Sequence, residues 1–134
     1  MDSRLSIFLF LLALSSLTFG GETEFECTVT LVHAVSQQGE MVTDTDHLLS
    51  QRGSKFSVDR ASGKVTGSNF LDSENSETVT VINEPTANSY YAIYESYGPI
   101  KMIGYLYIAN HRTWPTKPFT YTTAGEYVYS GFCE

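Results

Sequence analysis

The chain has 134 residues, of which 42% are hydrophobic and 13% aromatic, and its formal net charge is −7 at pH 7. This length suits a single small domain with one hydrophobic core. The acidic balance disfavours nucleic acid and anionic membrane surfaces as partners, because both are recognised through basic patches. It is compatible with a basic partner, although an acidic surface also serves solubility.

The start of the chain has the pattern of a secretory signal peptide. Arg4 supplies a positive charge, a short apolar run follows, and Gly20 or Gly21 offers a small residue for cleavage. The apolar run is shorter than a membrane-spanning helix needs, and an uncleaved anchor is the alternative. We therefore expect a signal peptide over residues 1–21 and a single β-domain over residues 22–134. The expected location is secreted or periplasmic, with no membrane anchor after cleavage.

Two cysteines, Cys27 and Cys133, lie at the first and last predicted strands of the mature chain. Thiols oxidise in an export compartment, so we predict that these two form a disulfide bond with each other. Closing so long a loop removes about 4.7 kcal/mol of denatured-state entropy. A reactive thiol pair is the alternative, but the sequence lacks the Cys-x-x-Cys spacing of such pairs.

The mature chain is predicted to begin with a half-buried strand over residues 24–35, where apolar and polar residues alternate. The positions predicted to share its apolar side are Phe25, Cys27, Val29, Leu31, His33 and Val35. A turn follows at residues 37–39. The segment 41–51 is ambiguous, because Asp44 or Thr45 can cap a short helix that would be the only helix of the mature chain.

A second hairpin is predicted over residues 55–60 and 64–66, turning at Gly63 in the left-handed conformation. The turn belongs to the phrase FSVDRASGKVTG of residues 56–67, which lies between the early cysteine and the closing SGFC of residues 130–133. In these features the chain resembles a family of small exported bacterial proteins without an assigned function. The resemblance implies export and a β fold, and it brings no catalytic residues.

An acidic loop is predicted over residues 70–77. Asp72, Glu74 and Asn75 carry the oxygen ligands that calcium prefers, but their spacing does not match a helix-loop-helix calcium site. A solvated loop is therefore the expected structure. Residues 77–83 form the next predicted strand, with alternating Val and Thr.

The most β-rich part of the sequence is residues 90–108, two runs hinged at Gly98 and Pro99. These two residues suit the central positions of a type II′ turn, which would place Tyr97 opposite Ile100. The further pairs predicted by this register are Tyr90 with Tyr107, Ala92 with Tyr105, Ile93 with Gly104 and Tyr91 with Leu106. Both faces of the hairpin are largely apolar, so one face is expected to pack on the core and the other to need a second cover.

The predicted strands cover residues 24–35, 55–60, 64–70, 77–83, 90–97, 100–108, 119–123 and 126–132. Short turns join most of them, and the predicted disulfide ties the first to the last. The predicted fold is therefore all-β, an antiparallel meander of about eight strands closed as a small barrel or a two-layer sandwich, with at most one short helix.

Motifs for catalysis or metal binding are missing from the sequence. There is no Gly-x-Ser-x-Gly, and nothing in the spacing of His33, His47 and Asp44 or Asp46 predicts a zinc site. We predict a protein that is not an enzyme, with no catalytic residues, metal or cofactor. Paired carboxylates of the glycosidase type leave no sequence motif, so an enzyme remains an alternative.

All nine tyrosines lie within residues 90–129. Tyrosine favours binding surfaces, but cross-strand tyrosine pairs also stabilise sheets without any ligand, and both interpretations stay open. In the binding interpretation the candidate residues are Tyr90, Tyr105, Tyr107 and Trp114. The first functional hypothesis is therefore an exported, non-enzymatic β-domain that binds a protein partner or a small ligand through its tyrosine-rich C-terminal half.

The alternative hypothesis is a secreted inhibitor of a basic enzyme such as lysozyme. Small disulfide-closed β-barrels that inhibit lysozyme are similar in size and compartment, and a basic enzyme would suit the net charge of −7. Those inhibitors carry a Ser-Gly-x-x-Tyr signature. Here the corresponding phrase begins with Ser62 and Gly63 but lacks the tyrosine.

Overall fold

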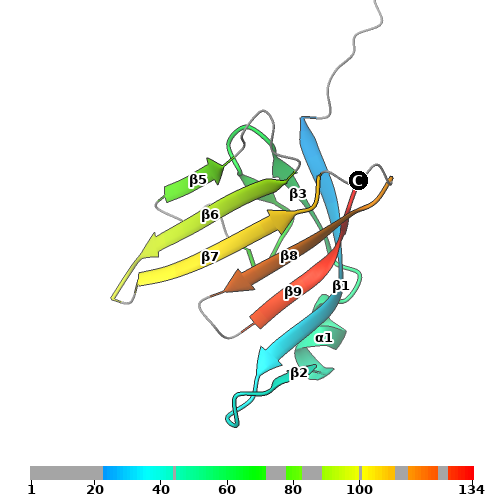
Figure 1. Ribbon diagram of the computed structural model, residues 1–134, viewed down its shortest axis with the longest axis vertical. Coiled ribbons are helices and arrows are strands. Elements are labelled where there is room, and N and C mark those ends of the chain that lie inside the picture. Colours follow the sequence, from blue (N-terminus) through cyan, green and yellow to red (C-terminus); the bar gives the residue numbers. More distant parts are fainter. Residues whose placement is uncertain are drawn as a thin grey trace, which may run out of the picture.

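The computed structural model describes residues 23–43, 45–71, 78–82, 89–99, 101–110, 115–123 and 127–134. These residues form one antiparallel sheet, curled into a half-barrel, and one short helix (Figure 1). The elements are β1 (Glu24–Val35), β2 (Met41–Thr43), α1 (Thr45–Gln51), β3 (Lys55–Asp59), β4 (Val65–Thr66), β5 (Thr78–Ile82), β6 (Tyr90–Tyr97), β7 (Lys101–Ile108), β8 (Lys117–Thr123) and β9 (Tyr127–Cys133). The predicted all-β antiparallel fold with one short helix is confirmed.

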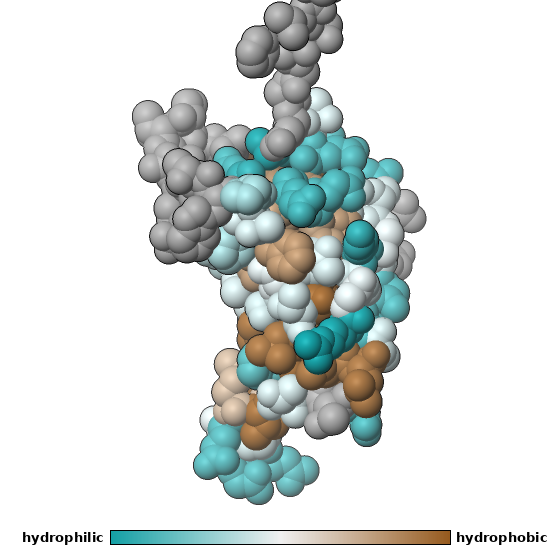
Figure 2. Space-filling view, turned by 90° about the vertical axis from the view of Figure 1, so that its right-hand side faces the viewer, coloured by the Kyte–Doolittle hydropathy of each residue, from teal (hydrophilic) through white to brown (hydrophobic). Residues whose placement is uncertain are grey.

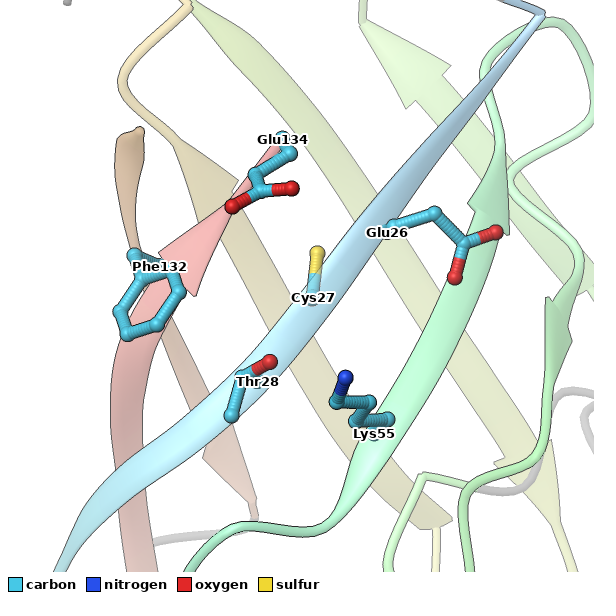
Figure 3. Close-up of a pocket in the computed structure, with 6 residues that line it drawn as sticks. All are labelled: Glu26, Cys27, Thr28, Lys55, Phe132 and Glu134. Atoms are coloured by element: carbon cyan, nitrogen blue, oxygen red, sulfur yellow. The ribbon is translucent and has the colours of Figure 1, made fainter. Parts of the chain in front are cut away.

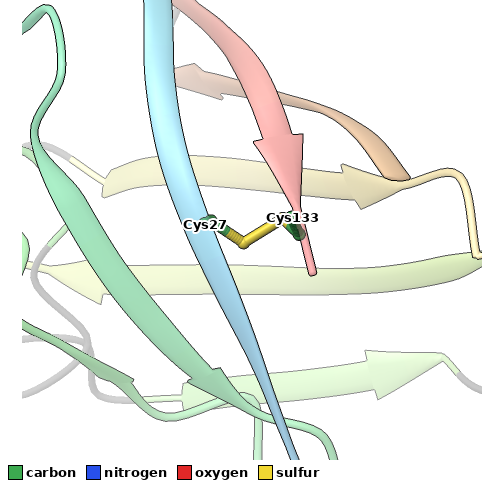
Figure 4. Close-up of a disulfide and its surroundings, with 2 residues drawn as sticks. All are labelled: Cys27 and Cys133. Atoms are coloured by element: carbon green, nitrogen blue, oxygen red, sulfur yellow. A yellow bond between two sulfur atoms is a disulfide. The ribbon is translucent and has the colours of Figure 1, made fainter. Parts of the chain in front are cut away.

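The sheet follows the order β4-β3-β1-β9-β8-β7-β6-β5, and β2 pairs with β1 off this path. From β5 to β9 the strands are neighbours both in sequence and in space. The first strand is an exception, because β1 lies between β3 and the last strand, β9. Cys27 and Cys133 stand directly opposite each other on this pair and form a disulfide with an S–S distance of 2.03 Å (Figure 4). The predicted bond is confirmed.

The concave side of the sheet holds a core rich in aromatic rings. Phe56 of β3 packs edge-on against Phe119 of β8, with 5.3 Å between ring centroids, and against Phe70, at 5.6 Å. Phe70 in turn stacks on Tyr129 of β9 at 4.1 Å. These contacts join strands from both halves of the sheet, so the curl follows from the packing of large side chains on one face.

The turn between β3 and β4 closes the seam between the two ends of the sheet. Gly63 in this turn has a φ of 72°, as predicted, and a Cβ there would lie 2.8 Å from Val79 and 2.9 Å from Val81, both on β5. The buried hydroxyl of Tyr94 on β6 donates a hydrogen bond of 2.8 Å to the Gly63 carbonyl. β5 and β6 are therefore held to the far end of the sheet by this turn, although β4 and β5 are not paired.

The first strand departs from the predicted alternation halfway along. Its register with β9 shifts between Val29 and Leu31. Beyond this bulge the fully buried residue is Val32, and Val35 is 49% exposed. The predicted burial of Leu31, His33 and Val35 on the side of Phe25 is therefore wrong, because one extra residue exchanges the two faces of a strand.

The central hairpin forms, but with a register different from the predicted one. Tyr97 pairs with Lys101 and Tyr90 with Ile108, so three residues connect β6 and β7 where a two-residue turn was predicted. The slip moves Tyr105 and Tyr107 to the face opposite Tyr90. Core packing explains it, because Leu106 and Ile108 are fully buried in this register.

Some of the other predicted elements differ from the structure, and some lie outside the described residues. Of the ambiguous segment 41–51, the helix begins at Thr45, and β2 precedes it as a strand that was not predicted. The predicted strand 64–70 is limited to Val65–Thr66. The predicted leader, Asp44, Ile100, the acidic residues of the loop before β5, and Trp114 lie outside the described residues.

Candidate functional site

Tyr90, a predicted binding residue, lies inside the core. It is only 2% exposed, and its ring packs edge-on against Phe25 with 5.1 Å between centroids. Its hydroxyl donates a hydrogen bond of 3.3 Å to the carbonyl of Asp59. Burial, reinforced by the negative charge of Asp59, raises the pKa of Tyr90 to about 12. Tyr90 is therefore a structural residue of the seam.

The two other predicted tyrosines lie together on the outer side of the sheet. Tyr105 is 38% exposed, and Tyr107 follows it two residues along β7. Tyr91 of β6, which was not predicted as a site residue, joins them: its ring centroid lies 5.9 Å from that of Tyr105 and 5.2 Å from that of Tyr107. The alternation of side chains along β6 shows that Tyr91 and Tyr90 point to opposite faces of the sheet. The pairing register of β6 with β7, which would have placed Tyr91 on the same face as Tyr105 and Tyr107, was predicted wrongly.

Neighbouring isoleucines extend this aromatic cluster. Ile103 is 48% exposed on β7 and Ile82 is 45% exposed on β5. Ile93 stands opposite Tyr105 in the sheet and Ile82 stands opposite Tyr91. We name this surface the tyrosine face, and its members are Ile82, Tyr91, Ile93, Ile103, Tyr105 and Tyr107.

The pairing of four strands arranges the tyrosine face in rows across the sheet. One row consists of Ile82, Tyr91, Tyr107 and Thr120, and the next of Thr80, Ile93, Tyr105 and Thr122. Neither row contains a charged side chain. Among the described residues, charge appears at the end of the face, where Glu95 stands opposite Ile103 and forms an ion pair of 3.3 Å with Lys101. The face is thus an uncharged surface on a protein of net charge −7.

The chemistry of the tyrosine face is that of neutral rings and hydroxyls. Partial burial raises the pKa of Tyr105 above its ordinary value, and the neighbouring Tyr91 and Tyr107 add to the shift. Tyr105 therefore stays protonated at physiological pH and can both donate and accept a hydrogen bond. Such a surface can bind a partner through apolar contact and directed hydrogen bonds.

A second apolar surface lies at the corner formed by β1, β2 and α1. Its members are unusually exposed for hydrophobic side chains: Val35 at 49%, Met41 at 60%, Val42 at 41% and Leu49 at 73%. Figure 2 shows hydrophobic side chains gathered in the lower half of this side of the molecule. The corner was not predicted, because the three residues of β2 are too few for an alternation to be recognised.

The hollow nearest the disulfide has a different, acidic character (Figure 3). It measures about 510 Å³ and is lined by Glu26, Cys27, Thr28, Lys55, Phe132 and Glu134. Backbone hydrogen bonds of 3.1 and 2.8 Å pair Glu26 with Glu134, and both residues line the hollow. The sulfur of Cys27 is held in the disulfide. The two glutamates can bind basic groups of a partner. The residues that line the hollow include no nucleophilic side chain beside a general base.

The histidines do not converge on a site in the described part of the chain. His33 lies opposite Val128 of β9 and Thr43 of β2. The side chain of His47 and the whole of His111 lie outside the described residues. Among those that are described, no group of three or more His, Cys, Asp and Glu side chains is placed to hold a metal ion. The same part of the chain contains no helix long and apolar enough to span a membrane.

Comparison of the chain with protein-family models, with curated proteins and with solved structures finds no match. The resemblance carried by residues 56–67 therefore remains one of local sequence and identifies no family. Function has to be inferred from the surfaces themselves, of which the tyrosine face is the most distinctive.

Proposed function

We propose that the protein is an exported, non-enzymatic β-domain that binds a partner through its tyrosine face. The observation that carries this proposal is a pair of uncharged rows of tyrosine and isoleucine side chains, in which Ile82 and Tyr105 are exposed and the others half-buried, on a protein of net charge −7. Interface centres are enriched in tyrosine and depleted of charge, and an exposed apolar patch on a small soluble domain often marks an interaction site. Tyr91 takes the place that Tyr90 had in the sequence-based hypothesis.

The shape of the surface favours a macromolecular partner over a small ligand. The tyrosine face is the outer side of a curled sheet, so it is convex. Small ligands are usually enclosed in concave pockets, which a convex face does not provide. The proposed partner is therefore a protein whose own surface is adaptable or concave.

Export is supported by the disulfide and by the signal-peptide pattern of the sequence. The proposed location is secreted or periplasmic. Intact-mass measurement of the protein from an extracytoplasmic fraction tests this. We expect a chain that starts just after Gly20 or Gly21, and a chain that still starts at Met1 would contradict the proposal.

The binding proposal is tested by capture of partners from the native extracytoplasmic fraction, followed by mass spectrometry. The test variant combines Ile103→Ser and Tyr105→Ser on the tyrosine face. The matched control combines Met41→Ser and Leu49→Ser at the other apolar corner, so that both variants lose two exposed apolar side chains. Each exposed change should alter the free energy of unfolding by only about 0.5 kcal/mol.

We expect the tyrosine-face variant to lose a partner that the wild type and the control both retain. If all three proteins capture the same partners in equal amounts, the tyrosine face is not the binding surface.

Inhibition of a basic enzyme is the second candidate, favoured by the acidic hollow beside the disulfide. The Ser-Gly phrase itself is used in a turn: the Asp59 carboxylate accepts hydrogen bonds of 2.7 Å from both the N–H and the hydroxyl of Ser62. A basic surface would instead meet Glu26 and Glu134. Assays of lysozyme with the wild type and with the Glu26→Gln, Glu134→Gln double variant test this candidate. Full lysozyme activity at saturating wild-type protein would exclude it for that enzyme.

A further inference from the structure

The strand β5 ends the sheet, and its own residues, Thr78–Ile82, carry none of the features that usually protect an edge. It runs Thr-Val-Thr-Val-Ile, contains no proline, glycine or charged residue, and pairs with β6 in one unbroken register. The other end of the sheet is different, since β4 has only two residues and lies between Gly63 and Gly67, both with positive φ. Natural edge strands are usually blunted by shortness, bulges, proline or lysine, because an unprotected edge pairs with other chains.

The outer edge of β5 offers backbone hydrogen-bonding groups in a fixed arrangement. In an antiparallel pair, alternate residues direct their N–H and C=O groups away from the partner strand. Within the described part of the chain, these groups of Thr78–Ile82 have no backbone hydrogen bond besides those to β6. The strand is also held firmly, because Val79 and Val81 pack on the core and against the turn at Gly63. Such a rigid edge is a template for one more strand.

We infer that an extended segment of the partner adds to the sheet along β5, beside the tyrosine face. This inference rests on the proposed function and names the element through which the partner binds. Side chains of an added strand would alternate, and the outward ones would lie next to Thr80 and Ile82, at the end of the two uncharged rows. Main-chain pairing would supply affinity and these neighbours would supply preference for β-branched or aromatic residues.

The occupant is a basic segment of another protein and not a second copy of this chain. Two β5 strands could pair over only five residues, far short of the roughly 800 Å² per partner that a stable interface buries. Two copies of net charge −7 also repel each other, whereas a basic segment is attracted. A flexible segment can in addition continue from the edge onto the tyrosine face, which a second convex half-barrel cannot do.

Hydrogen exchange measured residue by residue by NMR tests the inference. In the free protein we expect alternate amides of Thr78–Ile82 to exchange at nearly the unprotected rate while the others are protected by β6. The probe is the synthetic peptide Lys-Thr-Val-Thr-Val-Lys at millimolar concentration. The control is the same peptide with its four central amides N-methylated, which keeps side chains and charge but removes the donors. The unmethylated peptide should slow exchange of the outward amides at least tenfold.

Two substitutions on the strand complete the test. Adjacent residues direct their N–H groups to opposite sides, so one of Val79→Pro and Thr80→Pro removes an outward donor and no donor of the hydrogen bonds to β6. The variant that keeps the wild-type spectrum outside β5 should lose the effect of the peptide. Outward amides that are already protected in the free protein, or equal effects of both peptides, would overturn the inference.

These outcomes separate the two proposals. If strand addition fails while the tyrosine-face variant still loses its partner, the partner binds the face without extending the sheet. If the peptide protects β5 while the tyrosine-face variant captures partners normally, the edge binds and the face does not.

Discussion

The turn at Gly63 predicts a specific difference between two glycine substitutions. Gly63 and Gly39 both have positive φ, 72° and 80°, so alanine at either position costs roughly 1–2 kcal/mol of backbone strain. The alanine also restricts the unfolded chain equally in both variants. Only Gly63 is crowded: its Cβ would lie 2.8 Å from Val79 and 2.9 Å from Val81, whereas a Cβ at Gly39 has nothing within 4 Å. Overpacking of this kind costs about 1–3 kcal/mol more.

We therefore expect Gly63→Ala to lower the free energy of unfolding by about 1–3 kcal/mol more than Gly39→Ala. Urea denaturation followed by circular dichroism measures this difference, with unchanged m-values showing that both variants unfold from the same compact state. Equal losses for the two variants would refute the reasoning. In that case the turn would not pack against β5 in solution, and the half-barrel would be open along its seam.

Three further predictions concern stability. The substitution Tyr94→Phe leaves the buried carbonyl of Gly63 without its donor and should lower the free energy of unfolding by about 1–3 kcal/mol. Urea melts measure this loss, and a loss below about 0.5 kcal/mol would contradict the hydrogen bond. Replacing Cys27 and Cys133 with alanine should cost about 4–5 kcal/mol, and unchanged stability would contradict the entropic account. Burial raises the pKa of Tyr90 and Tyr121 to about 12, against an ordinary value of 10.0, so the unfolded chain loses these protons first. The free energy of unfolding should therefore be unaffected by these tyrosines below pH 10 and should fall as the pH rises toward 12. Denaturant melts and tyrosinate absorbance, measured over this pH range, test the expectation. A free energy of unfolding that does not change between pH 10 and 12 would count against burial of these hydroxyls.

Much of the fold follows from local sequence patterns. The alternation from Phe25 to Val29 predicts the buried face of β1, and the glycine after Ser62 predicts the left-handed turn. The export compartment expected from the signal-peptide pattern predicts the disulfide. Each of these signals lies within a few residues of the feature it specifies, or depends on chemistry that does not need the three-dimensional structure.

The hairpin register could not be obtained in this way, because distant residues decide it. A Cβ at Gly104 would overlap the Tyr121 hydroxyl, so Gly104 must face the ring of Tyr121 inside the core. That requirement comes from β8 and overrides the turn preference of Gly98 and Pro99. The bulge of β1 is similar, since its position is set by the pairing with β9 at the other end of the chain.

The wrong hairpin register also made part of the predicted binding site wrong. The tyrosine-rich segment was recognised from composition alone, and Tyr105 and Tyr107 do lie on one outer face. A shift of one residue nevertheless exchanged Tyr91 for Tyr90, because side chains alternate along a strand. Whether a tyrosine packs in the core or lies on the outer surface thus depends on which face of the strand its position has. Composition does not determine that face.

The central position of β1 has a consequence for how the chain acquires its structure. As the chain appears from its N-terminus, β1 can pair early with β3, but its other edge stays open until the last strand arrives, and Cys27 waits for a partner 106 residues away. Loop closure over such a distance is slow compared with local hairpin formation. A partly synthesised chain therefore exposes a long unpaired edge of β1, and unpaired strand edges promote aggregation. The sheet can be completed only after the last strand, β9, has been synthesised, and until then the open edge of β1 has to be kept from pairing with other chains.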